Sequence, residues 1–581
     1  MLFRSITTLR TIFTNDYWGR PLTYPASHKS WRPLTVLSFR FLRGFDSTFF
    51  HCSDLTMHRF VNILTHATTA DLVGKLAVKL LVPLSIDAEE QDNTTGVRFW
   101  IFVVTKFCFV LHPTHVEVVV NAANRSHIVS VLFAVYASDP SVPFLYFGVA
   151  ILLALLSSET ALFQIVPVAV TLIAISYNQQ YHGIRSPKRP RGNVIWQLIC
   201  IVLQQPRILF RILWLGVTAI LYYGGRLYFN TLSIPEGLIR PAENPFFPLT
   251  GWQRFYSYIM VLGIHIAKQY DYDYIGFSHE YGFNCIAPID TWYNIRLLPA
   301  LLIGLSHVLV GCIFLLRQRR RLTISKGLIL YAVTLAWTFT LFPISGIVKV
   351  GTFISDRIVV ASSVPIAILQ AYGITSWLQL GVRNSNDKSK VSWIDTILNQ
   401  RVQRKLLLLG IVFVLAWRRL HVRSLEWMSS GTLLESSLRT CPQFAKGHLE
   451  MSKIYSGLYL EKYNLTQARH HLNEAERIDP NYCDVHYQFA LLEAREHQYL
   501  LFEERLVNAL QCGFTMGQAH PMWHQYWPNV LDETHNTPSI VAENRKRYEY
   551  YMSVLAKAIE NEEKQSTQQQ PQRNKSPFVF K

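Results

Sequence analysis

Charged side chains are scarce in this chain. Only 16% of its 581 residues are charged, whereas 50% are hydrophobic and 13% are aromatic. This composition excludes a disordered chain and favours a membrane protein with many spans and a soluble part. Acidic residues are the scarcer kind, with 39 against 56 basic ones, so the net charge is +17.

The positive charge does not indicate nucleic-acid binding. The basic residues gather in three short loops between apolar runs, where they mark the cytoplasmic side of a membrane. We therefore expect membrane lipid, and no nucleic acid, as their partner. These loops contain Arg185, Lys188, Arg189 and Arg191; Arg317, Arg319, Arg320 and Arg321; and Lys388, Lys390, Arg401, Arg404 and Lys405.

Closely spaced cysteine pairs are absent. The eight cysteines form no C-x-x-C motif, and Asp271-Tyr-Asp273 alone is too weak a pattern to define a metal site, so no metal is expected. Five cysteines would face an oxidising compartment in the topology given below, where one or two disulfides can form without a defined connectivity. They are Cys52, Cys285, Cys441, Cys483 and Cys512.

About ten apolar runs are long enough, or nearly so, to cross a bilayer as helices. We therefore predict an all-α fold with a polytopic transmembrane helix bundle. Counting crossings from the basic loops places 226–295 and everything after about 418 on the lumenal side. The predicted spans are 58–82, 98–111, 128–139, 142–156, 162–176, 207–225, 296–316, 327–343, 357–380 and 406–417.

The same parity makes residues 1–57 a lumenal loop. This loop carries seven Arg and Lys residues, and Met1–Arg10 has no apolar region long enough for a signal peptide. We therefore expect a further transmembrane helix upstream of this sequence.

The C-terminal part has the pattern of helical repeats. Ala468, Leu472, Ala475 and Pro480 have the spacing of the second helix of a tetratricopeptide repeat. His448, Met451, Ser452 and Tyr455 fit its first helix. The predicted domains are 1–57, a partial first lumenal loop; 58–424, the membrane domain; 425–560, a lumenal helical repeat array; and 561–581, a disordered tail.

Several motifs carry a family resemblance. Phe13-Thr-Asn-Asp-Tyr-Trp-Gly19, the stretch Ser27–Phe39, His58–His66 and His112-Pro-Thr-His-Val-Glu117 resemble the transmembrane and tetratricopeptide-repeat-containing family of protein O-mannosyltransferases. Weaker matches follow at Ser158-Glu-Thr-Ala161, at Ser355-Asp-Arg-Ile358 and at Phe277-Ser-His-Glu-Tyr-Gly282, where Glu280 stands in place of the family's Asp.

The resemblance implies a C-type glycosyltransferase fold in the endoplasmic reticulum membrane. It implies transfer of mannose from dolichyl phosphate mannose, with inversion, to Ser or Thr hydroxyls of polypeptides that contact the repeat groove. The lipid-linked donor is a substrate, and no cofactor is expected. In the family an acidic pair stands shortly before the Asn-Asp-aromatic-Trp-Gly motif, and this sequence begins too late to contain it.

The chemistry suggests roles for the remaining residues. A carboxylate must take the proton of the acceptor hydroxyl, and Asp16 and Glu117 are the candidates. Arginine suits the departing phosphate because its planar fork can bind two oxygens. Candidate donor-binding residues are Arg32, Arg125, Arg357, His112 and His115, and candidate site-lining residues are Asn15, Trp18, Glu159 and Glu280.

Other interpretations remain open at this stage. Glu117 could instead form a structural pair with Arg125, and the three arginines could be snorkelling at helix ends. The chain could also be an inactive membrane-anchored repeat scaffold. A transporter is disfavoured because the spans show no internal repeat.

Overall fold

A computed structural model describes most of the chain and divides it into two compact units. The described residues are 9–24, 27–49, 54–82, 88–181, 194–229, 243–282, 284–318, 324–348, 350–351, 354–378, 400–457, 463–512, 515–533 and 536–568. The first unit, here called the membrane unit, comprises 1–276 and 288–428. The second, the repeat unit, comprises 277–287 and 429–581.

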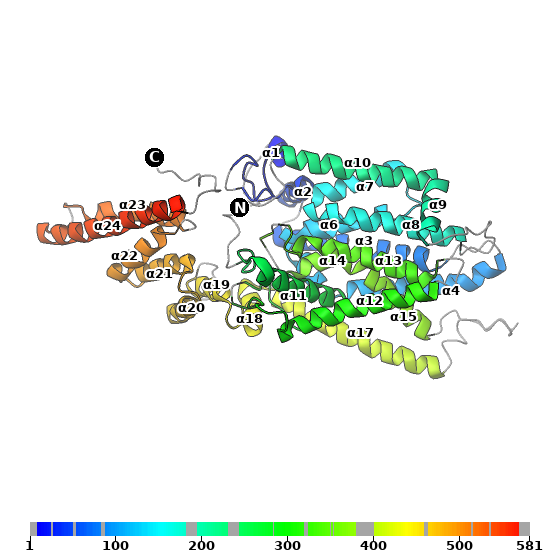
Figure 1. The fold of residues 1–581 in the computed structure, drawn as a ribbon. Helices are drawn as coiled ribbons and strands as arrows, with labels where there is room; N and C mark the ends of the chain where they lie inside the picture. Colours follow the sequence, from blue (N-terminus) through cyan, green and yellow to red (C-terminus); the bar gives the residue numbers. More distant parts are fainter. Residues whose placement is uncertain are drawn as a thin grey trace. The chain divides into compact units, whose positions relative to one another are not determined.

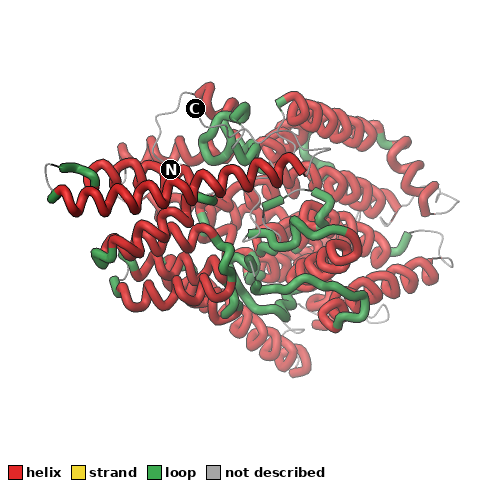
Figure 2. The backbone as a smooth tube through the Cα atoms, turned by 60° about the vertical axis from the view of Figure 1, so that its left-hand side comes forward, coloured by secondary structure: helices red, strands yellow, loops and turns green. Residues whose placement is uncertain are grey.

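Every regular element among the described residues is a helix, as Figures 1 and 2 show. This confirms the predicted all-α fold. The α-helices of the membrane unit are α1 Leu9–Thr14, α2 Pro33–Phe49, α3 Asp54–Leu81, α4 Ala88–Val110, α5 His115–Val120, α6 Arg125–Ala137, α7 Phe144–Ser157, α8 Ile165–Tyr181, α9 Val194–Gln204, α10 Pro206–Tyr228, α11 Gly251–Gln269, α12 Leu298–Gln318, α13 Lys326–Thr338, α14 Val359–Ser362, α15 Val364–Leu378 and α17 Gln400–Glu426.

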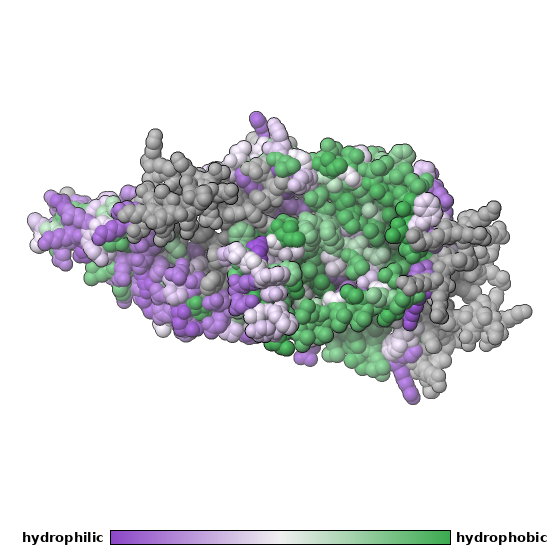
Figure 3. Space-filling view, viewed as in Figure 1, coloured by the Kyte–Doolittle hydropathy of each residue, from purple (hydrophilic) through white to green (hydrophobic). Residues whose placement is uncertain are grey.

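Each of the ten predicted spans overlaps a helix in the described part of the chain. Among the described residues, four helical stretches are long and apolar enough to cross a membrane, and a bent pair of helices, Asp356–Ser362 with Val364–Leu378, gives a fifth. The other predicted spans are shorter or carry more polar residues, so the number of crossings stays a prediction. The four stretches are Glu159–Tyr181, Pro206–Tyr228, Ile295–Gln318 and Lys326–Ile344. Figure 3 shows largely hydrophobic side chains on the outward surface of this unit.

Short 3₁₀ helices interrupt the bundle. They matter for function, because irregular backbone at membrane depth is tolerated where it is buried in protein or lines a polar cavity. They are η1 Ala122–Asn124, η2 Glu159–Gln164, η4 Ile295–Leu297, η5 Phe339–Ile344 and η6 Asp356–Ile358.

Residues 1–57, which were predicted to form a loop, contain helical segments. The structure places helices α1 and α2 in this part of the chain. In α2, Phe39 and Leu42 are buried while the neighbouring Arg40 and Phe41 are exposed. The two basic residues of α2, Arg40 and Arg43, therefore lie on the exposed side of an amphipathic helix.

The repeat unit consists of antiparallel helices at the predicted positions. Helix α19 packs on α20, and α21 packs on α22. Ala468, Leu472 and Ala475 are fully or almost fully buried, as their spacing predicted. The helices are α18 Ser430–Thr440, α19 Ala445–Tyr455, α20 Leu465–Ile478, α21 Cys483–Arg495, α22 Tyr499–Leu510, α23 Met516–Val530 and α24 Pro538–Gln568.

Helix α24 continues into the segment that was predicted to be a disordered tail. It extends to Gln568, because its run of Glu, Lys and Gln consists of good helix formers. Residues 569–581, the rest of the predicted tail, lie outside the described residues.

A segment from the connection between α11 and α12 completes the repeat unit. Residues 277–287 belong to this unit although residues on both sides of them belong to the membrane unit. Glu280 pairs with Lys446 at 2.9 Å, and Asn284 Nδ2 donates to the carbonyl of Ile478 at 3.1 Å. A disulfide joins Cys285 to Cys441.

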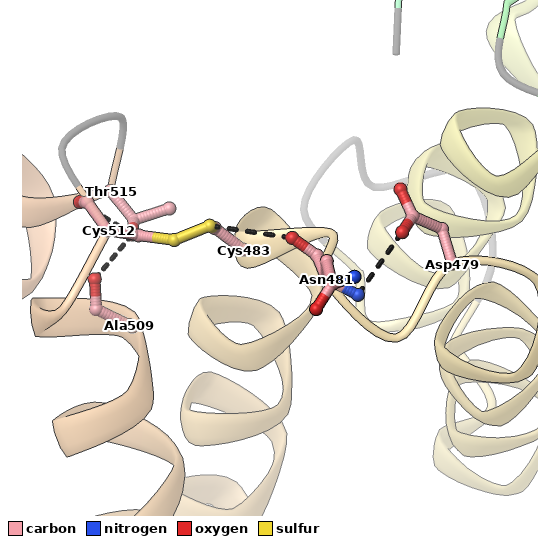
Figure 4. Close-up of a disulfide and its surroundings, with 6 residues drawn as sticks. All are labelled: Asp479, Asn481, Cys483, Ala509, Cys512 and Thr515. Carbon is pink, nitrogen blue, oxygen red and sulfur yellow. Dashed lines mark hydrogen bonds between the residues drawn. A yellow bond between two sulfur atoms is a disulfide. The ribbon is translucent and has the colours of Figure 1, made fainter. Parts of the chain in front are cut away.

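A second disulfide joins the next pair of helices. Cys483 at the start of α21 bonds to Cys512 just after α22, and Figure 4 shows the bridge together with the turn at Asn481. Four of the five cysteines expected in an oxidising compartment are therefore paired, whereas Cys52 lies outside the described residues.

We predict that Cys441→Ser loosens residues 277–287. The disulfide spans 156 residues, and loss of a disulfide of this kind typically costs about 2–5 kcal/mol of stability. Hydrogen exchange measured by mass spectrometry should therefore show faster exchange across 277–287 and α18. The control is Cys312→Ser, which removes an exposed free thiol and should change nothing. Unaltered protection in Cys441→Ser would contradict the prediction.

Candidate functional site

Asp16 organises the first loop. Its side chain is buried, and its two carboxylate oxygens accept four hydrogen bonds. These bonds occupy it as an acceptor, so its assignment as a catalytic base stays a prediction. The donors are the backbone N–H groups of Trp18 (3.0 Å), Arg20 (2.9 Å) and His28 (3.0 Å) and the hydroxyl of Ser27 (2.6 Å).

The neighbours of Asp16 shape the same loop. Asn15 Nδ2 donates to the carbonyl of Gly19 at 3.0 Å, and the positive φ of Gly19, 89°, favours glycine there. Trp18 is half exposed at 49%. Tyr17 is buried and donates its hydroxyl proton to the carbonyl of Ala123 at 2.6 Å, and burial raises its pKa to about 12.

Arg32 forms an ion pair with Glu159, the first residue of η2. Arg32 Nε lies 2.7 Å from Glu159 Oε2, and its Nη1 donates to the hydroxyl of Ser126 at 2.9 Å. The backbone N–H of Trp31 donates to the other carboxylate oxygen at 2.5 Å. The guanidinium also lies 5.0 Å above the ring of Tyr17. Two residues predicted for the site are therefore in direct contact.

A second arginine approaches the same carboxylate. Arg226, in the last turn of α10, lies 3.5 Å from Glu159 Oε1 and donates to the carbonyl of Lys29 at 3.2 Å. Lys29 is itself buried and donates to two backbone carbonyls. The side chains of Arg32, Arg226 and Glu159 thus form a cluster of two cations and one carboxylate, here called the Arg32–Glu159–Arg226 cluster.

An apolar groove of about 280 Å³ ends at this cluster. Helices α7 and α10, which run side by side in Figure 1, supply most of its walls. Leu152, Leu155 and Leu221 are typical of its lining, and Arg226 is its charged member. The groove therefore combines a long apolar surface with a cationic end.

Glu117 pairs with Arg357, and the alternative of a Glu117–Arg125 pair is wrong. Arg357 Nη1 lies 2.7 Å from Glu117 Oε1, and the backbone N–H of Arg357 donates to Oε2 at 3.0 Å. Asn124 Nδ2 donates to Oε1 at 3.0 Å. Glu117 is buried, so these donors replace its hydration. Its catalytic role stays a prediction.

Arg125 instead joins α6 to α2 and α3. It is 1% exposed and donates to Asn62 Oδ1 at 2.7 Å, to Ser38 Oγ at 3.1 Å and to the carbonyl of His58 at 2.9 Å. Its guanidinium also lies 4.8 Å from the centre of the Phe39 ring. These partners fill its donor positions, so in this structure Arg125 is an internal tie between helices.

Three consecutive residues connect these networks. Asn124 binds Glu117, Arg125 binds α2 and α3, and Ser126 binds Arg32. This junction, Asn124–Ser126, lies where η1 passes into α6. Three of the candidates, Arg32, Glu117 and Arg125, therefore meet at one helix start.

His112 and His115 are buried away from solvent. His115 Nδ1 lies 3.0 Å from His66 Nε2, and its Nε2 lies 2.9 Å from Ser363 Oγ. The rings of His112 and His115 stack at 5.0 Å, and His112 contacts Thr114 and the carbonyl of Gln269. Both imidazoles thus belong to a hydrogen-bonded helix interface, and their donor-binding role stays a prediction.

A polar cavity lies between the helix breaks. It measures about 10 Å³, room for about one water molecule. His127, Thr160, Gln164, Thr340 and Arg357 are its polar lining residues. Gln164 Oε1 is buried and has no hydrogen-bond partner in the described part of the chain. The polar residues that line the cavity come from α6, η2, η5 and η6.

A second ion network lies next to Arg357. Asp356 accepts from Lys268 at 2.9 Å and lies 3.5 Å from Arg423. Lys268 also pairs with Asp273 at 3.2 Å. In the Asp271-Tyr-Asp273 motif, Asp271 pairs with Arg419 at 2.8 Å, so both of its carboxylates have basic partners.

Glu280, the remaining predicted site residue, belongs to the repeat unit, where it pairs with Lys446. Four further residues of these networks were not predicted from the sequence: Arg226, Lys29, Gln164 and Lys268. Arg226 lies just beyond the predicted span 207–225, and a cation directly after an apolar run was the signal that could have identified it.

The chain is similar to several proteins that are named protein O-mannosyl-transferases. The chain is 23% identical over 481 residues to protein O-mannosyl-transferase F38B6.6 of Caenorhabditis elegans, which covers 82% of this chain and 57% of the relative. It is 24% identical over 602 residues to protein O-mannosyl-transferase Tmtc3 of Drosophila melanogaster, which covers 96% and 60%. Human protein O-mannosyl-transferase TMTC3 is 31% identical over 127 residues, 22% of this chain.

The chain thus spans about 60% of the length of the two relatives that cover most of it. No family model matches the chain, and no solved structure matches it.

Apolar spans, helix breaks beside buried ion pairs and a helical array together define a polytopic helical membrane protein with a charged site inside its bundle. The similarities confirm the resemblance that the motifs indicated: the chain is related to the transmembrane and tetratricopeptide-repeat-containing protein O-mannosyltransferases.

We predict that Glu117→Gln destabilises the membrane unit, because it removes the carboxylate charge that pairs with the largely buried Arg357 at 2.7 Å. Breaking a buried pair costs about 3–5 kcal/mol, whereas the double variant Glu117→Gln/Arg357→Gln should recover most of that loss. Thermal unfolding of the detergent-solubilised protein measures the difference. Glu533→Gln breaks an exposed pair with Arg545 and should change stability by at most about 1 kcal/mol. Equal effects of Glu117→Gln and Glu533→Gln would refute the prediction.

Proposed function

We propose that this chain is a protein O-mannosyltransferase that moves mannose from dolichyl phosphate mannose to Ser or Thr hydroxyls of polypeptides. The two relatives that cover most of the chain are named protein O-mannosyl-transferases, and the lipid-linked donor and the Ser/Thr acceptors are part of the proposal. The observation that carries the proposal is the apolar groove that ends at the Arg32–Glu159–Arg226 cluster.

The cluster has the charge that a lipid phosphate requires. Two arginines, Arg32 and Arg226, share the single carboxylate of Glu159, so the cluster keeps an excess of positive charge. When the bond between C1 of mannose and the phosphate oxygen breaks, the departing phosphate gains negative charge. Fixed cations stabilise that charge more in the transition state than in the ground state, which lowers the barrier.

The groove suits the lipid part of the donor. Its walls are mainly Leu side chains of α7 and α10, and such a surface can bury isoprenoid units at roughly 0.8 kcal/mol per CH₂. With the lipid in the groove, the phosphate group would meet Arg226 first. Attack of the acceptor hydroxyl from the opposite face of C1 would give inversion.

The compartment is part of the proposal. The repeat unit holds two disulfides, which persist in oxidising compartments. This supports a multi-pass protein of the endoplasmic reticulum membrane with its repeats in the lumen. There the array could contact unfolded acceptor polypeptides, because helical arrays bind peptides on their concave surfaces.

We predict that Arg226→Gln lowers mannosyl transfer by about 10²–10³-fold, through loss of one cation at the leaving phosphate. Transfer of radiolabelled mannose from dolichyl phosphate mannose to a Ser/Thr-rich peptide measures the effect. Arg207→Gln is the matched control, because Arg207 is an exposed residue in the first turn of the same helix. Full activity of Arg226→Gln would overturn this placement of the phosphate.

We also predict that Gly225→Phe blocks the groove. Gly225 lines it, and a Cβ there would meet nothing within 4 Å, so the new ring should enter the groove without disturbing the fold. KM should rise for a long-chain donor and stay nearly constant for a short-chain phosphomannose analogue. Gly224→Phe, at a position equally open but outside the groove lining, should change neither value. An equal rise for both donors would remove the groove from the proposal.

One observation favours the alternative of an inactive repeat scaffold. The carboxylates of Asp16 and Glu117 are both engaged by donors and cations, so neither is free to take a proton as it stands. If the purified protein and its Arg226→Gln variant transfer no mannose beyond background while still capturing polypeptides, the scaffold is the better description.

A further inference from the structure

Asn464-Leu-Thr466 has the acceptor pattern for N-linked glycosylation, Asn-x-Ser/Thr with x other than proline. The pattern alone is weak, because the chain contains it four times: at Asn93, Asn124, Asn464 and Asn574. The structure separates these positions.

Asn464 is the acceptor that the fold leaves open. Its side chain and that of Thr466 are exposed at the start of α20, in the repeat unit. Its Oδ1 accepts a hydrogen bond from the backbone N–H of Gln467 at 3.1 Å and so caps the helix. The cap uses Oδ1, whereas the atom that would carry a glycan is Nδ2, for which the described residues show no hydrogen bond.

Asn124 is the opposite case. It is 8% exposed, and its Nδ2 donates to Glu117 Oε1 at 3.0 Å inside the bundle. A glycan on that nitrogen would break the junction described above. Asn93 lies within α4, which was predicted to begin on the cytosolic side, and Asn574 lies outside the described residues.

We infer that Asn464 is an N-glycosylation site and that its glycan is compatible with the folded helix cap. The inference rests on the lumenal placement of the repeats in the proposed function. In the reaction, Asn464 Nδ2 attacks C1 of the first N-acetylglucosamine of a lipid-pyrophosphate-linked oligosaccharide. The N–C1 bond forms, the C1–O bond breaks, the lipid pyrophosphate leaves, and one amide proton passes to a carboxylate of the oligosaccharide-transferring enzyme.

The helix cap is compatible with this modification because capping uses Oδ1 of Asn464 and glycosylation uses Nδ2. Glycosylation replaces one hydrogen of Nδ2 and leaves the lone pairs of Oδ1, which accept from Gln467. The same cap can therefore form whether or not Nδ2 carries a glycan.

The test is expression of the full chain in mammalian cells, followed by gel mobility with and without peptide N-glycosidase F. Wild type should migrate one glycan more slowly, and the enzyme should abolish the difference. Thr466→Ala and Asn464→Asp should migrate like the deglycosylated protein, although both retain an oxygen for the cap. Thr466→Ser keeps the acceptor pattern and should retain the shift, as should the double variant Asn93→Gln/Asn574→Gln.

A second acceptor sequence, appended after Lys581, separates two kinds of failure. If the appended site is glycosylated and Asn464 is not, the inference is overturned while the lumenal orientation stands. If neither is glycosylated, the orientation fails and the inference fails with it. If Thr466→Ala and wild type show shifts of equal size, Asn464 carries no glycan and the inference is overturned.

Discussion

The need to give buried charges hydrogen-bonding partners inside an apolar bundle is the constraint on which this structure depends. An unpaired charge at membrane depth is costly, and here several charged side chains are paired or hydrogen-bonded around the Asn124–Ser126 junction at the start of α6. From this junction, contacts run to Glu117 and on to Arg357, to α2 and α3 through Arg125, and to Glu159 through Arg32. The helices η1, η2 and η6 supply residues to these contacts, which suggests why the bundle is irregular there.

The same constraint links the site to the rest of the membrane unit. In η6, Asp356 and Arg357 are adjacent in sequence but pair in different directions, one with Lys268 and Arg423 and the other with Glu117. Arg423 is in the last turn of α17. Asp356 and Arg357 therefore connect η6 to α5, α11 and α17, which are far apart in the sequence.

Much of this was predictable from local sequence. The spacing of Ala468, Leu472 and Ala475 placed the array helices, and the motifs around Asp16 and Glu117 named residues that the structure brings into two linked networks. The partner of Glu117 was not predictable from the sequence. Glu117 and Arg357 are 240 residues apart, and either Arg125 or Arg357 could have supplied the opposite charge. Arg226 was missed because a cation after an apolar run is more often a topology signal than part of a site. The assignment of 277–287 to the repeat unit had no local signal, since it depends on long-range pairing.

The disulfide between residues 277–287 and the rest of the repeat unit sets an order of events during synthesis of the chain. Cys285 is made 156 residues before its partner Cys441, and helices α12 to α17 are synthesised in between. The Cys285–Cys441 disulfide therefore cannot form until α12 to α17 and part of the repeat unit have been synthesised. Residues 277–287 are thus joined covalently to the rest of the repeat unit only late in the synthesis of the chain.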